Sequence, residues 1–231
     1  MSVQTAIVRR LRALAFRKQE VTHHYWEYYG RLHFVSEAIK KLELPAYKVL
    51  DVGGATGNNL LRAFGIRDVT TLDLDPRADI VSSAENIPSP DNSYDMVTCI
   101  DTLEHIPEGV RDRCIQEMLR VASLAVFIVA PQKTEANVSA EQLVLKYRKV
   151  KFLEEHRLYG LVDFANIERQ LQDHENNHGI SRFEVKELDN LLSWVILMTL
   201  DYVSPSAIYQ EAFFLENAFF SRRKALSIFL R

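Results

Sequence analysis

An aspartate followed by small residues marks one short loop, Asp51-Val52-Gly53-Gly54-Ala55-Thr56-Gly57. The apolar run before it predicts a strand over 49–52, and the apolar pattern after it predicts a helix. At such a strand–turn–helix junction, backbone N–H groups point toward a bound ligand. Glycine allows positive φ there and leaves room for the ligand. The pattern therefore indicates a ligand-binding loop, with a glycine-rich turn that binds nothing as the alternative.

The acid at the strand end bears on which nucleotide-type ligand this loop would take. A dinucleotide fingerprint, G-x-G-x-x-G, presents its helix N-terminus to a pyrophosphate, which Asp51 would repel. The same carboxylate suits a cationic ligand with an ammonium group. A second acid, Asp73, lies 20 residues after Gly53, at the end of a predicted strand that Pro76 stops. There it can accept hydrogen bonds from both hydroxyls of a ribose. We interpret the nearby Asp75 as a turn acid before the proline.

The Asp51 loop resembles motif I of the class I S-adenosylmethionine-dependent methyltransferases, which usually reads D-x-G-x-G-x-G; here Ala55 replaces the middle glycine. The segment 82–107 is similar to a longer block of this family, DAE-x-LP…D-x-S-[FY]-D-hhh…LEH-[IV]. Ser83 stands where the family commonly has the acid that meets the adenine amino group. The resemblance extends over about 49–131 and implies that S-adenosylmethionine is the cofactor.

The resemblance also implies which residues bind this cofactor. Asp73 would hold the ribose, and the backbone of Ala84 with the side chain of Glu85 would replace the missing acid at the adenine. Arg31, placed like an arginine of many relatives, would pair with the carboxylate of the methionyl moiety; the alternative is that its aromatic helix only packs on the sheet edge. The expected cofactor-binding set is Arg31, Asp51, Gly53, Gly54, Ala55, Gly57, Asp73, Leu74, Ala84, Glu85, Asp101, Thr102 and Leu103.

Two histidines are candidate catalytic residues. His105 follows a predicted strand over 94–100, beside the expected place of the sulfonium methyl, and its imidazole suits a general base near neutral pH; it could also only shape the site. His156 lies in a segment that resembles the "EH-x-x-x-GL" stretch of some methyltransferases of surface-polysaccharide clusters, or it belongs to a charged helix end stopped by Gly160. The other histidines lack partners at metal-ligand spacing, so no metal site is expected.

The resemblance implies an α/β, Rossmann-like class I methyltransferase fold with a seven-stranded, mostly parallel sheet, helices on both faces and a helical lid insertion. Apolar periodicity predicts helices over 3–17, 25–42, 108–121, 191–203 and 207–218, and later strands over 125–129, 181–188 and 224–230. Four segments are expected: an N-terminal helical cover over 1–45, a cofactor-binding core over 46–131, a helical substrate lid over 132–180, and a C-terminal completion of the sheet over 181–231.

Composition limits the class of protein and its partners. A length of 231 residues, a 47% hydrophobic content and a net charge of −3 suit a globular protein that does not bind nucleic acid through bulk charge. Two cysteines, Cys99 and Cys114, are expected to be buried reduced thiols, which suits a cytoplasmic protein. Residues 1–48 hold nine Lys and Arg against four Asp and Glu. This excess predicts a solvated helix face, with contact to an acidic substrate or an anionic membrane as alternatives.

The expected function is methyl transfer from S-adenosylmethionine to a small-molecule acceptor, such as a sugar or glycolipid precursor, bound under residues 132–180. A module that binds the cofactor without catalysis stays open. A nicotinamide-dependent oxidoreductase is a third reading, against which Asp51 and the loop spacing argue. The C-terminal aromatic residues are expected to lie at a buried edge or dimer contact, with peripheral membrane attachment as the alternative: Phe213, Phe214, Phe219 and Phe220. The oligomeric state stays open.

Overall fold

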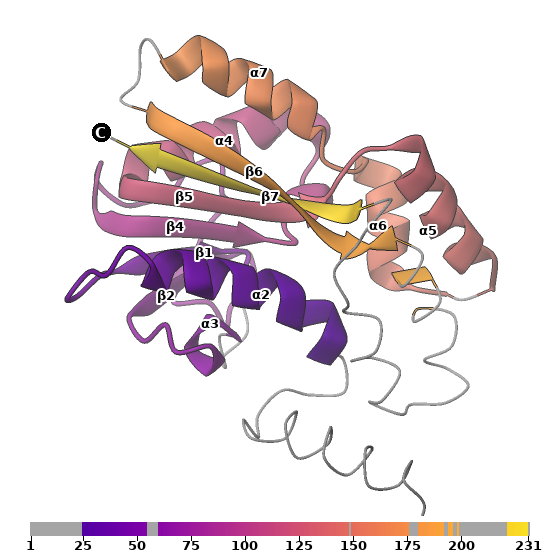
Figure 1. Cartoon of the computed structure of the whole chain (residues 1–231), viewed down its shortest axis with the longest axis horizontal. Coiled ribbons are helices and arrows are strands. Elements are labelled where there is room, and N and C mark those ends of the chain that lie inside the picture. The colour runs from indigo at the N-terminus through magenta and orange to yellow at the C-terminus, as the bar shows by residue number, and fades with distance from the viewer. Residues whose placement is uncertain are drawn as a thin grey trace, which may run out of the picture.

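A seven-stranded sheet forms the centre of the protein, in the order β3-β2-β1-β4-β5-β7-β6 (Figure 1). The computed structural model describes residues 25–54, 60–147, 149–175, 180–191, 194, 195, 198 and 221–230. The first five strands pair in parallel, whereas β7 runs antiparallel between β5 and β6. The strands are β1 (Val49–Val52), β2 (Val69–Asp73), β3 (Ile80–Val81), β4 (Tyr94–Ile100), β5 (Ala122–Pro131), β6 (Ile180–Asn190) and β7 (Ser221–Leu230). The expected mostly parallel, seven-stranded sheet is confirmed.

Helices cover both faces of this sheet because side chains alternate along each strand. Val49 of β1 packs with residues of α2 (Tyr25–Lys40) and α3 (Leu60–Ala63) on one face. Its neighbour Leu50 packs on the opposite face with residues of α4 (Glu108–Val121) and α7 (Phe164–Glu175). In Figure 1, α2 lies on one side of the sheet and α4 and α7 lie on the other.

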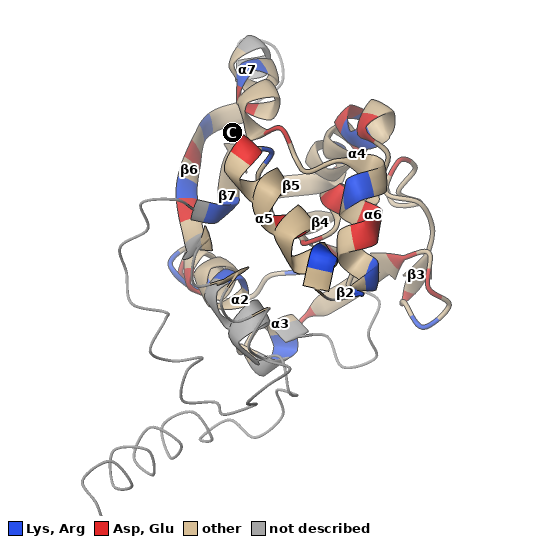
Figure 2. Ribbon diagram, turned by 90° about the vertical axis from the view of Figure 1, so that its right-hand side faces the viewer, with Lys and Arg blue, Asp and Glu red and all other residues tan. Residues whose placement is uncertain are grey.

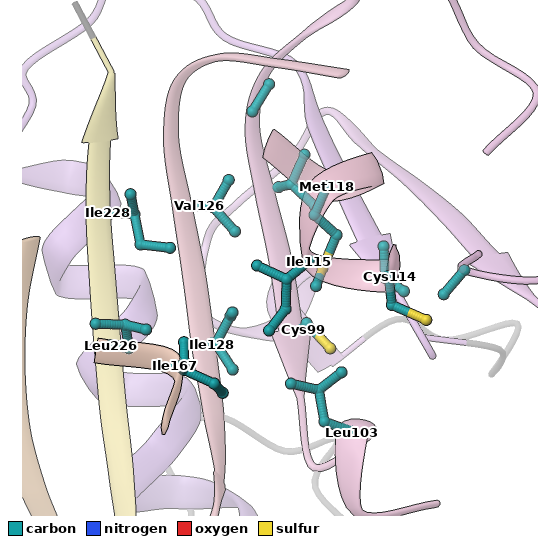
Figure 3. Close-up of a cluster of buried hydrophobic side chains, with 14 of the residues drawn as sticks. Cys99, Leu103, Cys114, Ile115, Met118, Val126, Ile128, Ile167, Leu226 and Ile228 are labelled. Atoms are coloured by element: carbon teal, nitrogen blue, oxygen red, sulfur yellow. The ribbon is translucent and has the colours of Figure 1, made fainter. Parts of the chain in front are cut away.

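A cluster of buried apolar side chains fills the face of the sheet that α4 covers. Figure 3 shows side chains of α4, among them Cys114 and Met118, lying over residues of β4, β5 and β7. Both cysteines, Cys99 of β4 and Cys114, are buried free thiols, as expected. Burial raises the pKa of Cys114 to about 11, so this thiol stays protonated near neutral pH.

Two further helices stand at the carboxyl ends of the parallel strands, the end that faces the viewer in Figure 2. They are α5 (Glu135–Tyr147) and α6 (Lys151–Tyr159), and α6 contacts a short 3₁₀ turn, η1 (Leu103–His105), that follows β4. The segment 132–180 is mainly helical, as predicted. Of these helices, α7 packs its apolar side on the sheet and so belongs to the layer that covers this face.

Several predicted element bounds agree with the structure, and others lie outside it. The predictions over 94–100 and 108–121 match β4 and α4. Strand β5 begins three residues earlier than predicted, because the chain passes from the end of α4 directly into extended backbone at Ala122. The helices expected over 3–17 and 207–218 lie outside the described residues, as does most of 191–203. Among the residues that the structure describes, no helix has the length and apolarity needed to cross a bilayer.

Gly53 allows the ends of β1 and β4 to meet. Its φ is +83°, and a Cβ built on it would lie 2.1 Å from Oγ1 of Thr102. That hydroxyl is 3.2 Å from the carbonyl oxygen of Val52, to which it donates a hydrogen bond. The Gly53 N–H donates to the carbonyl of Leu72 at 2.7 Å. Only glycine satisfies both the positive φ and the close approach of Thr102.

We expect Gly53→Ala to lower the free energy of unfolding by at least about 2 kcal/mol, because it adds both backbone strain and a steric clash. Urea unfolding followed by circular dichroism measures this change. The matched control is Gly109→Ala, since no atom lies within 4 Å of the new Cβ in the first turn of α4. The control should change stability by no more than about 1 kcal/mol, in the stabilising direction. Equal effects of the two substitutions would contradict the role given to Gly53.

Candidate functional site

The candidate site lies where the strand order reverses. From the neighbouring pair β1 and β4, the chain builds β2 and β3 outward on one side and β5 on the other. Ligands of open α/β sheets bind outside the carboxyl ends of the strands at such a point. Here Gly53, which follows β1, meets Thr102, which follows β4. Asp51 lies near the end of β1, and Asp101 directly follows β4. The carboxylate of Asp51 is held in place because Thr98 Oγ1 donates a hydrogen bond to it at 2.7 Å.

The acids after β2 have different surroundings. Oδ1 of Asp73, the last residue of β2, accepts a hydrogen bond from the backbone N–H of Asp75 at 3.0 Å. Asp75 is bound by the guanidinium of Arg77, whose Nη2 lies 2.7 Å from Oδ2. Hydrogen bonds from Arg77 lower the pKa of Asp75 to about 2. Asp75 is therefore engaged within its own turn, which agrees with its interpretation as a turn acid.

Residues expected near the cofactor differ in what their side chains offer. Leu74 is 74% exposed, whereas Ala84 and Leu103 are buried in the core, so the side chains of these two are not available to a ligand. The Ser83 hydroxyl accepts a hydrogen bond from the Glu85 N–H at 3.2 Å, which occupies it locally. Ala55 and Gly57 lie outside the described residues, as do residues 55–59 as a whole.

A buried carboxylate joins three elements beside this site. Asp101 adopts φ +47°, a left-handed conformation that aspartate tolerates better than most residues. Arg223 of β7 holds it with two donors, Nε at 2.9 Å and Nη2 at 3.1 Å. Arg31 of α2 adds Nη1 at 2.7 Å. Burial alone would raise the pKa of Asp101, but the charges of the two arginines outweigh it and lower the pKa to about 2. Arg31 is thus already paired, and a cofactor carboxylate would share its guanidinium with Asp101.

The two candidate catalytic histidines lie side by side. The ring centroids of His105 in η1 and His156 in α6 are 4.9 Å apart. Nδ1 of His105 lies 2.8 Å from Oε2 of Glu155, and Nδ1 of His156 lies 2.8 Å from Oε1 of Glu141. His156 is 4% exposed, so its ring lies inside the protein and not on the surface. Burial lowers the pKa of His105, and the neighbouring His156 adds to this, so that imidazole is neutral near pH 7.

Glu104 lies next to these rings and is 1% exposed. Its Oε1 is 4.0 Å from Nε2 of His156. Burial raises the pKa of Glu104 to about 8, and the nearby charge of Asp101 contributes. Behind the cluster, Glu141 forms a buried ion pair with Arg222, whose guanidinium lies 4.4 Å from the ring centroid of Trp194.

Arg111 of α4 fixes the end of α6, and so the position of His156. Its guanidinium donates hydrogen bonds to the carbonyl oxygens of Tyr159 at 2.9 Å, Gly160 at 2.6 Å and Leu161 at 3.1 Å. Gly160 ends the helix at φ +82°, as the sequence suggested. These charge-assisted bonds satisfy carbonyl groups that a helix end otherwise leaves unpaired.

The sequence matches a family model described as "Methyltransferase domain" over residues 13–192. The chain belongs to this methyltransferase family. It is an enzyme that transfers a methyl group, with S-adenosylmethionine as its cofactor. The expected class I methyltransferase identity is therefore confirmed at this level. No curated protein sequence is significantly similar to the chain.

Solved methyltransferase structures share the fold at low sequence identity. The plantazolicin methyltransferase BpumL in complex with SAH has a TM-score of 0.57 and 11% identity, with 100% of this chain and 91% of that chain covered. A possible histamine N-methyltransferase from Thermotoga maritima has a TM-score of 0.53 and 16% identity, with coverage of 90% and 91%. The magnesium protoporphyrin IX methyltransferase of Synechocystis PCC 6803 with bound SAH has a TM-score of 0.53 and 13% identity, with 87% of this chain and 82% of that chain covered.

Several residues of this methyltransferase site carried no signal in the sequence. Arg222 and Arg223 precede the strand predicted over 224–230 and were given no role, yet both are buried. Glu141 and Arg111 lie on amphipathic helices, where a charged residue is usually solvated. A signal did exist for Glu104, which stands between two residues assigned to the site, Leu103 and His105, within one short motif.

The raised pKa of Glu104 predicts a pH-dependent stability. Between the ordinary glutamate pKa of 4.5 and about 8, the folded protein holds a proton that the unfolded chain has lost. Stability should therefore fall as pH rises through this range, by at most about 1.4 kcal/mol per pH unit. Glu104→Gln mimics the protonated acid and should flatten the dependence. Urea unfolding from pH 5 to 8 with EDTA present tests this.

The control for this measurement is Glu108→Gln, which removes a mostly exposed carboxylate paired with Lys133. It should keep the slope of the unmodified protein. Parallel slopes for Glu104→Gln and the unmodified protein would show that Glu104 does not carry the dependence.

Proposed function

We propose that this methyltransferase transfers the methyl group to a small-molecule acceptor at the carboxyl ends of β1, β2 and β4. The observation that carries the proposal is the gathering of Asp51, Gly53 and Thr102 at the point where the strand order reverses. Asp73 lies at the end of the adjoining strand β2. A carboxylate here suits the ammonium group of S-adenosylmethionine, and Asp73 suits its ribose.

The proposed cofactor site uses side chains at some positions and backbone at others. The residues after Gly53, among them Gly54, Ala55 and Gly57, would offer backbone N–H groups to the ligand. The N–H of Gly53 itself is bonded to Leu72, and Gly53 sets the turn that leads into them. Ala84, Leu103 and Thr102 contribute backbone, whereas the exposed Leu74 and the side chain of Glu85 border the adenosine. Arg31 and Asp101 form a fixed charge pair that faces the methionyl end.

The proposed acceptor lies beside η1 and α6, near His105. The imidazole of His105 is part exposed, and Glu155 holds its Nδ1, so Nε2 is the atom that could take a proton from the acceptor. The buried ring of His156 packs against that of His105 and would help to hold it in position. An acceptor hydroxyl of a sugar or glycolipid precursor fits this arrangement. That choice rests on the segment around His156 and on the helices α5 and α6 above the site.

Two other functions make different predictions. A module that binds the cofactor without catalysis would bind S-adenosylmethionine and never release S-adenosylhomocysteine with any acceptor. A nicotinamide-dependent oxidoreductase would bind NADH, which the carboxylate of Asp51 disfavours at the phosphate position. We expect a cytoplasmic enzyme with no nucleic-acid partner. The segments considered for membrane contact, the basic N-terminus and the aromatic residues Phe213 to Phe220, lie outside the described residues.

We expect Asp73→Asn to weaken binding of S-adenosylhomocysteine about 10- to 100-fold, because the loss of a charged hydrogen-bond acceptor for two hydroxyls costs about 1.5–3 kcal/mol. Isothermal titration calorimetry measures the affinity. The matched control is Asp75→Asn, two residues further along and engaged by Arg77. The control should bind within about threefold of the unmodified protein. Equal losses would show that general negative charge, not the ribose contact, governs binding.

The acceptor class is tested by incubating the protein with S-adenosylmethionine and pools of nucleotide sugars and glycolipid precursors. We expect S-adenosylhomocysteine to form together with a product heavier by one methylene unit, detected by mass spectrometry. His105→Ala should lower the rate more than the affinity for the cofactor. Turnover with other small molecules but with none from these pools would overturn the sugar assignment.

A further inference from the structure

We propose that Glu104, His105 and His156 form a binding site for a divalent transition-metal ion. The three residues come from η1 and from α6, which contacts it. Each offers one ligand atom, and these three atoms all lie within 4.8 Å of one another. The sequence analysis expected no metal site, since it found no partners at metal-ligand spacing for the other histidines. The three residues proposed here are not close in the chain: two are adjacent, and the third lies about 50 residues away.

The histidine rings are oriented as ligands by carboxylates on their far side. Glu155 accepts from Nδ1 of His105 at 2.8 Å, and Glu141 accepts from Nδ1 of His156 at the same distance. With the proton fixed on Nδ1, each ring directs the lone pair of Nε2 away from its carboxylate. This carboxylate–histidine arrangement is the usual support of metal-bound imidazoles, and it raises their basicity. Arg222 in turn fixes Glu141.

Two atoms of the cluster are buried without a hydrogen-bond partner in the described part of the chain: Oε2 of Glu104 and Nε2 of His156. Leaving such groups unpaired costs about 1–3 kcal/mol each. The other oxygen of the same carboxylate, Oε1 of Glu104, lies 4.0 Å from Nε2 of His156, which is too long for a direct hydrogen bond. An ion between them would satisfy both groups. A bridging water is the competing explanation, and the experiment below separates the two.

The donor atoms indicate which class of ion fits. Two imidazole nitrogens and one carboxylate oxygen suit Zn²⁺, Co²⁺ or Fe²⁺, whereas Mg²⁺ and Ca²⁺ prefer oxygen ligands alone. Bonds of about 2.0–2.1 Å place tetrahedral ligand atoms about 3.4 Å apart. Ion binding would therefore draw the ligand atoms together by up to about 1.4 Å from their separations of at most 4.8 Å.

Three protein ligands leave coordination positions free for a substrate atom. The site adjoins Asp101 and Thr102, next to the proposed cofactor position, so an acceptor oxygen could occupy such a position. This role rests on the proposed function and would replace His105 as the group that acts on the acceptor. The metal site itself depends only on the geometry of the three residues.

The test uses the full-length protein, freed of metal with EDTA and dialysed, and titrated with Co²⁺ at pH 7.5 without S-adenosylmethionine. We expect one equivalent of Co²⁺ to give visible absorption bands of a four- or five-coordinate ion. Zn²⁺ should displace it with higher affinity, and a tenfold excess of Mg²⁺ should not. His105→Ala and Glu104→Gln should each weaken Co²⁺ binding at least about tenfold. Glu155→Gln should weaken it less while leaving one equivalent bound.

The matched control is His33→Ala, which removes an exposed histidine of α2 and should leave the titration unchanged. Circular dichroism confirms that each variant is folded; because His105 is part exposed, its variant is the decisive one if Glu104→Gln fails to fold. Failure to bind one equivalent, or unchanged affinity in folded His105→Ala, overturns the proposal and favours a bridging water. Binding of S-adenosylhomocysteine is measured separately in metal-free protein, so loss of the metal site and failure of the proposed function give different results.

Discussion

The buried ion pairs of Asp101 with Arg31 and Arg223 are the constraint on which the candidate site depends. They connect α2, the end of β4 and the antiparallel strand β7, three elements far apart in the sequence. The left-handed backbone of Asp101 turns the chain out of β4. As a result, Thr102 meets Gly53 on one side, and η1 presents Glu104 and His105 on the other. Removal of either arginine would leave part of a buried charge uncompensated, which is far more costly than loss of an exposed pair.

Strand β7 supports both halves of the site because adjacent residues of a strand point to opposite faces. Arg223 reaches Asp101 on the face that α2 covers, and Arg222 reaches Glu141 of α5 on the other face. The first contact positions the loop after β4, and the second positions His156 through Glu141. The antiparallel placement of β7 next to β5 brings this pair of arginines to the carboxyl ends of the parallel strands, although they lie near the amino end of β7.

The sequence was sufficient where the controlling interactions are local. The bounds of β4 and α4 follow from apolar periodicity, and the turn acid Asp75 and the helix stop at Gly160 follow from residue type. The fold class followed from the resemblance of the segment 49–131 to class I methyltransferases, whose motifs stand close together in the chain. Contacts between distant segments were not predictable in this way. Periodicity fixes the face of a helix, but not which helix approaches it, so neither the partner of Arg31 nor the pairing of His105 with His156 could be derived.

Buried apolar residues and buried charged residues lie in different parts of the protein. Figure 3 shows apolar side chains of α4 packed over those of β4, β5 and β7, and this buried hydrophobic cluster stabilises the sheet. Buried charged groups gather instead at the carboxyl ends of the strands, where Glu104 and Arg222 are withdrawn from water and the side chain of Asp101 is 17% exposed. Burial of charges in this way contributes little net stability, and apolar replacements often stabilise a protein more. Stability therefore does not explain why these groups are there. Charged groups that are held in fixed positions suit the alignment of a cationic methyl donor with its acceptor, which is the role that the proposed function gives to this end of the sheet.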